Sequence, residues 1–240
     1  MARDKNGSDD GRLPTRSTRA EVDGFLARLR AAPPPQGGGR MIFAMDATAS
    51  REPSWDRACR IQGEMFLATE ALGGLSVQLA WYRGFEELAA YPWTRTSKDL
   101  LTHMTRVACR GGQTQIIRVL RHAAAETRKE KVSALVFVGD AMEEDIDRLC
   151  HVAGELGLLG VPAFIFHEGG DPVARKAFDE IARLTKGACV PFDANAADQL
   201  RDLLAAVAVF AAGGRRALED FGRRRGGAAL RLTHRLAGKT

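Results

Sequence analysis

The sequence predicts an α/β protein with a Rossmann-like, doubly wound sheet of six mostly parallel strands and helices on both faces. Short apolar segments alternate with longer segments of helical periodicity, which is typical of consecutive βαβ units. The second and third apolar segments are separated only by the residues RGFE. We therefore expect a hairpin there and one antiparallel strand at the edge of the sheet.

Strands are expected where the sequence is short and mostly apolar, at residues 41–45, 75–82, 87–93, 134–139, 162–166 and 188–192. Helices are expected at residues 54–72, 97–109, 114–128, 143–157, 172–186 and about 196–212. If the strands take the common order 3-2-1-4-5-6, the first and fourth are neighbours where the strand order reverses. Ligands bind at that point, beyond the carboxyl ends of the strands.

The main domain is expected to span residues 40–212, between two segments of different composition. Residues 1–39 are predicted to be a disordered N-terminus with a short helix and a Pro/Gly linker, PPPQGGG. Residues 213–240 are predicted to be a basic tail, since they carry eight Lys and Arg against Glu219 and Asp220. That tail is either a solvated, partly helical extension or a contact for an acidic partner or nucleic acid.

Composition indicates a cytoplasmic protein. The chain is 45% apolar and 27% charged, with a formal net charge of +5, which is ordinary for a globular protein. Its N-terminus lacks the apolar core of a secretory signal, and no apolar stretch reaches the roughly 18 residues that a membrane span needs. The four cysteines form no CxxC pair, which is expected of thiols in a reducing compartment.

Oxygen-bearing side chains stand where two of the predicted strands end. Asp46 ends the first strand and is followed at alternate positions by Thr48 and Ser50, and Asp140 ends the fourth strand. Thr114 precedes a predicted helix, where it either caps that helix or turns its hydroxyl toward the two aspartates. Carboxylates, hydroxyls and water suit a small hard cation, Mg²⁺ above all, with Mn²⁺ and Ca²⁺ as alternatives. An open coordination position would favour an acidic side chain of a partner, which is binding without a chemical step.

The segments DATAS, GGQT and VGDA, in this order and at these strand and helix boundaries, resemble the metal-ion-dependent adhesion site (MIDAS) of von Willebrand factor type A (vWA) domains. The resemblance covers about residues 40–212 and follows the pattern DxSxS, then Thr, then Asp. Thr48 replaces the usual serine, and Ala141 replaces a common glycine; neither change removes an oxygen ligand. The metal ligands carried over from the resemblance are Asp46, Thr48, Ser50, Thr114 and Asp140.

This resemblance implies a Rossmann-like fold and metal-assisted binding of a protein ligand, usually without catalysis. Intracellular bacterial relatives often act as adaptors beside AAA+ ATPases, so the resemblance implies an AAA+ ATPase as one class of partner.

Two other functions are compatible with parts of the sequence. In a haloacid-dehalogenase-like phosphatase, Asp46 would be the nucleophile, Thr114 a phosphate contact, Lys131 the cation, and Glu144 or Asp145 part of a metal loop. Such enzymes usually carry a second aspartate as general acid and base where this chain has a threonine. The remaining alternative is an adaptor with a vestigial metal site that binds through its basic tail.

Four charged residues near the site are candidates for selecting the partner. Arg51 and Arg83 are expected to steer an acidic ligand. Glu143 and Glu144 either stabilise the first turn of the following helix or add negative potential beside the metal. The sequence therefore predicts a non-enzymatic, metal-dependent adaptor module.

Overall fold

The computed structural model describes residues 17–33, 39–52, 75–192 and 197–224, and the helix expected at 54–72 lies outside them. Six strands form one sheet in the order β3-β2-β1-β4-β5-β6. Within the described residues only β3 is antiparallel to its neighbour, so the predicted fold class is confirmed, and the strands take the common order considered above. The strands are β1 Arg40–Asp46, β2 Ser76–Arg83, β3 Glu87–Ala90, β4 Ala134–Gly139, β5 Ala163–Glu168 and β6 Ala188–Phe192.

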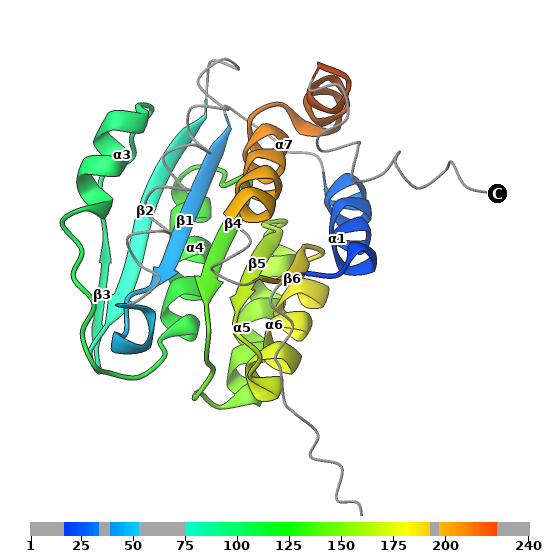
Figure 1. Cartoon of the computed structure of the whole chain (residues 1–240). Helices are drawn as coiled ribbons and strands as arrows, with labels where there is room; N and C mark the ends of the chain where they lie inside the picture. Colours follow the sequence, from blue (N-terminus) through cyan, green and yellow to red (C-terminus); the bar gives the residue numbers. More distant parts are fainter. Residues whose placement is uncertain (1–16, 34–38, 53–74, 193–196, 225–240) are drawn as a thin grey trace, which may run out of the picture.

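Helices cover both faces of this sheet. Figure 1 shows α1 and α7 on one face and α4, α5 and α6 on the other. A short 3₁₀ helix, η1, follows β1 directly. The bounds are α1 Arg19–Ala31, η1 Ala49–Arg51, α3 Ser97–Met104, α4 Ile116–Lys129, α5 Ile146–Leu158, α6 Pro172–Leu184 and α7 Ala197–Arg224.

Strand β1 is buried along its whole length. Its odd-numbered apolar residues, such as Phe43, pack on the α1 and α7 side, and its even-numbered ones, such as Ile42, pack on the α4 side. Successive side chains of a strand point to opposite faces, so Asp46 leaves the sheet on the α4 side. The continuous apolar run that ends at Asp46 is thus typical of a parallel strand covered on both faces.

The N-terminal helix α1 is part of the core. Its Thr18 cap and Glu21 form a capping box, and its apolar stripe is buried against the sheet. The ring centroids of Phe25 lie 6.0 Å from Phe164 and 5.5 Å from Phe166, both on β5. Helix α1, which precedes the predicted domain boundary at residue 40, therefore packs into the same core as the sheet and covers it near β5.

Several element ends also differ from the predicted ones; helix α3, for example, ends at Met104 instead of residue 109. Strand β3 stops at Ala90 instead of residue 93, because Pro92 has no amide hydrogen to donate to the sheet. Helix α7 continues past residue 212 to Arg224 across a kink at Gly214, whose φ is 68°. Beyond the kink, Leu218 is buried in the core, so the first part of the predicted basic tail belongs to the domain.

Candidate metal centre

The two predicted aspartates lie at the ends of neighbouring parallel strands. Asp46 is the last residue of β1, Asp140 follows the last residue of β4, and the register pairs Met45 with Val138. A Cβ placed on Gly139 would lie 3.7 Å from the Cβ of Asp46. The sheet thus brings together two carboxylates that are far apart in the sequence.

The Asp46 carboxylate is fully buried and is held at both oxygens. Its Oδ1 accepts a hydrogen bond from the Thr48 amide (2.7 Å), and its Oδ2 accepts one from the Tyr82 hydroxyl (2.9 Å). Burial raises the pKa of Asp46, and repulsion by Asp140 adds to that rise, although the hydrogen bonds oppose it. Burial and the neighbouring Asp46 charge raise the pKa of Tyr82 well above its usual value, which keeps this hydroxyl a donor.

Two hydroxyls stand beside this carboxylate. The Thr48 Oγ1 and Ser50 Oγ atoms are 3.0 Å apart, because η1 turns the chain back within one turn after Thr48. Thr48 is buried, whereas Ser50 is exposed. One member of the predicted ligand set therefore opens to solvent.

Thr114 is joined to the loop that follows β4. Its amide donates to Glu143 Oε2 (3.1 Å), and its hydroxyl accepts from the Glu143 amide (3.0 Å). The cap position of α4 is Gln115, not Thr114, and no side chain caps it there. The alternative in which Thr114 caps this helix is therefore wrong, and the contacts join its loop to the loop that begins at Asp140.

The Thr114 loop is also joined to the β2–β3 hairpin. The Gln113 amide donates to the Gly84 carbonyl (3.0 Å), and Gln115 Nε2 donates to the carbonyls of Arg83 (3.0 Å) and Gly84 (3.2 Å). A Cβ on Gly112 would lie 2.0 Å from the Gly84 carbonyl oxygen, so only glycine fits this approach. Tyr82, Gly84 and Gln115 were missed in the sequence analysis because only their contacts in space connect them to the site.

The two arginines predicted to steer a partner are both engaged. Arg83 donates from Nε and Nη2 to the carboxylate of Glu87, both at 2.9 Å, and from Nη1 to the Ala108 carbonyl. Arg51 is only 1% exposed and forms an ion pair with Glu168. The prediction that Arg51 steers an acidic ligand is therefore wrong, because its guanidinium lies inside the protein.

The two glutamates predicted to select a partner bind the preceding helix. Glu144 accepts hydrogen bonds from the amides of Ile116 and Ile117 in the first turn of α4, and Glu143 holds Thr114. Burial raises the pKa of Glu144, while these amide bonds act in the opposite direction. Asp145, not the glutamates, caps α5. The predicted dipole interaction is therefore made with α4, which comes earlier in the chain, and not with α5.

The donor chemistry of this site fits a small divalent cation. Among the described residues, Asp140 Oδ1 is a buried carboxylate oxygen without a hydrogen-bond partner, which is costly unless a cation or water meets it. Within the same residues, no three His, Cys, Asp or Glu side chains lie close enough to form a metal site. The two aspartates would therefore need hydroxyl oxygens and water as further ligands, as oxygen-rich magnesium sites use.

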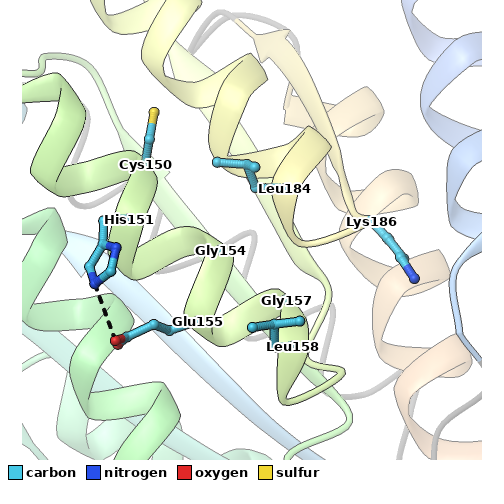
Figure 2. A pocket seen from close by; sticks show the side chains of 8 residues that line it. All are labelled: Cys150, His151, Gly154, Glu155, Gly157, Leu158, Leu184 and Lys186. Atoms are coloured by element: carbon cyan, nitrogen blue, oxygen red, sulfur yellow. Dashed lines mark ion pairs between the residues drawn. The ribbon is translucent and has the colours of Figure 1, made fainter.

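A separate hollow lies on the outer side of α5 and α6. Figure 2 shows its lining, which includes Cys150, the ion-paired His151 and Glu155 (3.4 Å), and Lys186. Its volume is about 470 Å³, and none of the predicted metal ligands lines it. This hollow and the carboxyl edge of the sheet are therefore different places.

No helix in the described part of the chain is long and apolar enough to cross a membrane. Cys109, Cys150 and Cys189 are free thiols, and burial raises the pKa of Cys109 to about 11 and that of Cys189 to about 12.

Neither protein-family models nor curated protein sequences match the chain. Solved structures do. The VWA domain of SpRpn10 aligns with a TM-score of 0.57 at 14% identity, over 70% of this chain and 94% of that domain. Proximal thread matrix protein 1 from the mussel byssus, with a zinc-occupied MIDAS motif, aligns with a TM-score of 0.59 at 16% identity, over 74% of this chain and 49% of that one.

A third similar structure is the pilus adhesin SpaC from Lactobacillus rhamnosus GG in its open conformation. It aligns with a TM-score of 0.58 at 10% identity, over 78% of this chain and 31% of that one. The chain thus spans most of the SpRpn10 domain, but only about half of the mussel protein and a third of the adhesin. Together with the strand order and the edge hairpin, these alignments show that the chain has the von Willebrand factor A fold.

Proposed function

We propose that this protein is a divalent-metal-dependent protein-binding module, an adaptor whose MIDAS-type site takes an acidic residue of its partner. The observation that carries the proposal is the pairing of Asp46 with Asp140 at adjoining strand ends, where Asp140 Oδ1 is buried and has no hydrogen-bond partner among the described residues. The similar mussel byssus protein has a MIDAS motif occupied by zinc, which supports divalent metal use by this fold. We propose Mg²⁺ as the metal, with Mn²⁺ and Ca²⁺ as alternatives.

Two of the predicted ligands have distinct structural roles in this proposal. Asp46 is oriented by Tyr82 and the Thr48 amide, so its carboxylate needs no rearrangement on binding. Ser50 is exposed and brings the donor set to the surface, where a partner approaches. A bound divalent cation would have an open coordination position, and a Glu or Asp side chain of the partner would fill it.

Several contacts disfavour the phosphatase alternative. Lys131 would have to act beside Asp46, but it precedes β4 at the opposite edge of the sheet and donates to the Leu159 and Gly160 carbonyls. Asp46 is fully buried with both oxygens accepting hydrogen bonds, which suits a ligand better than an attacking nucleophile. Thr48 supplies no proton-transfer group comparable to an aspartate. We therefore propose a function without a catalytic step.

We also propose the cytoplasm as the location and an AAA+ ATPase as one class of partner. The free thiols of Cys109, Cys150 and Cys189 support a reducing compartment. The partner class comes from the family resemblance of the three motifs, and co-purification with a tagged chain tests it.

The test is a calorimetric titration of Mg²⁺ and Mn²⁺ into the full chain, into Asp46→Asn and Asp140→Asn, and into a matched control, Asp171→Asn. Asp171 caps α6, and asparagine is also a good cap, so the control keeps its helix. We expect saturable binding in wild type and control that weakens by about tenfold or more in the two site variants. A phosphomonoester assay on the same samples should show no turnover.

Two results would contradict the proposal. Turnover that disappears in Asp46→Asn would indicate the phosphatase. Partner binding that ignores EDTA but is lost when residues 225–240 are removed would indicate the adaptor that binds through its tail.

A further inference from the structure

The buried guanidinium of Arg51 is close enough to the proposed metal site to be attracted by Asp140 and Asp46. Helix η1 places it directly after Ser50, and its side chain is 1% exposed. Its ion-pair partner, Glu168, is the last residue of β5, and that side chain is 14% exposed. An almost fully buried charge pair needs a structural or functional reason, because removing both charges from water is costly.

The topology shows where this guanidinium lies. Strand β4 separates β1 from β5 in the sheet. Gly139 and His167 are register partners, so the next residues, Asp140 and Glu168, lie at the same level at the carboxyl ends of β4 and β5. Arg51 follows β1, and Glu168 ends β5. The side chain of Arg51 must therefore extend across the carboxyl end of β4, next to Asp140, to reach Glu168.

The electrostatics agree with that position. Burial lowers the pKa of Arg51, and attraction by Asp140 and then by Asp46 opposes that decrease. While Glu168 balances Arg51, two uncompensated carboxylates remain, and their charge equals that of one divalent cation. Without Glu168, the guanidinium would neutralise part of the charge that such a cation needs.

We propose that Arg51 competes with the divalent cation for Asp46 and Asp140, and that Glu168 restrains Arg51, so that this ion pair sets the metal affinity of the site. The inference rests on the proposed metal site and adds two positioning residues to it. Repulsion between the guanidinium and a divalent cation is strong because Arg51 and Asp46 are buried, where the effective dielectric constant is lower than in water.

The test uses calorimetric titration of Mn²⁺ alone into the full chain and four variants: Glu168→Gln, Arg51→Gln, the double variant, and Glu180→Gln. Glu180 pairs with Arg183 on the exposed side of α6, so this control makes the same change of charge elsewhere. We expect Glu168→Gln to bind Mn²⁺ about tenfold more weakly, Arg51→Gln about tenfold more tightly, and the double variant close to wild type. Without metal, in EDTA, Arg51→Gln should unfold at a lower temperature, because three carboxylates then repel one another.

A purely structural role predicts the opposite pattern. In that case the double variant would bind as weakly as Glu168→Gln, and the inference would be rejected. If Arg51→Gln does not fold, the inference is tested by comparing Glu168→Gln with the double variant, which lacks both charges. Tighter Mn²⁺ binding by the double variant than by Glu168→Gln would support it.

The test also separates this inference from the proposed function. If wild type and Glu168→Gln bind Mn²⁺ equally, the metal site stands and the inference is wrong. If only Arg51→Gln binds, the inference stands and metal dependence of the wild type is wrong. If no variant binds, both are wrong.

Discussion

Glu126 lies at the end of the sheet where the parallel strands begin, away from the metal site, and shows how burial and hydrogen bonds compete. Glu126 accepts hydrogen bonds from Trp93 Nε1 (2.9 Å) and Lys129 (2.7 Å), and it pairs with Arg40, which stacks over the Trp93 ring. Burial by itself raises the pKa of Glu126, but the bonds from Lys129 and Trp93 outweigh it, and the pKa lies below the usual 4.5. The charged carboxylate therefore stabilises the native state.

This residue predicts a pH dependence of stability. Because the folded pKa is lowered, the contribution of Glu126 is complete above the unfolded value of 4.5 and disappears as the pH falls through the folded pKa. Glu126→Gln should cost about 1–3 kcal/mol near neutral pH and lose less stability than wild type on acidification. Urea unfolding of both proteins, followed by tryptophan fluorescence across this acid range, measures this difference in stability. The exposed Glu219→Gln should retain the wild-type acid dependence.

A second residue-scale prediction concerns the glycine pair before Thr114. An added Cβ at Gly112 would meet the Gly84 carbonyl oxygen at 2.0 Å, whereas at Gly111 it meets nothing within 4 Å. Gly112→Ala should push the Thr114 loop off the hairpin and lower both the melting temperature and the metal affinity, and Gly111→Ala should change neither. Equal behaviour of the two variants in thermal unfolding and metal titration would show that this close approach is unimportant.

At the scale of elements, α1 is the clearest case of tertiary packing. An isolated helix of 13 residues is marginally stable in water, so α1 depends on the apolar face it buries. Phe25, on α1, is fully buried, and its ring packs against the rings of Phe164 and Phe166 on β5. The helix therefore stabilises the sheet, and the sheet stabilises the helix.

Truncation of this side chain should be severe. Phe25→Ala should lower the free energy of unfolding by about 3–5 kcal/mol, because it leaves a cavity beside the two aromatic rings. Phe85→Ala, at a residue that is 72% exposed, should change it by less than about 0.5 kcal/mol. Denaturant unfolding of both variants checks the prediction, and a small effect of Phe25→Ala would mean that α1 is dispensable.

At the scale of the whole molecule, the last helix determines where the domain ends. Helix α7 resumes after the Gly214 kink, buries Leu218 and packs Phe221 partly against the core. This apolar surface belongs to the same core cluster as α1 and the centre of the sheet.

Two truncations test that boundary. A chain that ends at Arg224 should keep the thermal stability of the full chain, whereas one that ends at Ala212 should melt at a lower temperature. The reason is that the second cut exposes the core side chains that Leu218 and Phe221 cover. Equal melting temperatures of the two truncated chains would place the boundary at residue 212, as composition alone suggested.

Local patterns were enough for the architecture. The alternation of apolar and amphipathic segments and the short RGFE connection predicted the α/β class and the antiparallel edge strand. The observed strand order is the common one of such sheets. In that order Asp46 and Asp140 fall at neighbouring strand ends, because a parallel sheet aligns all its carboxyl ends. Hydrophobic periodicity and chain connectivity carry this information, and both are properties of nearby residues.

Only the tertiary structure determined what the charged residues around the site do. Arg51 was expected to steer an acidic ligand and is buried, because Glu168, more than a hundred residues later, lies across the end of β4 from it. Glu144 was expected to serve the following helix or a partner and instead binds the first turn of α4. A charge is buried or exposed according to which distant groups compensate it, and those groups become neighbours only when the sheet forms.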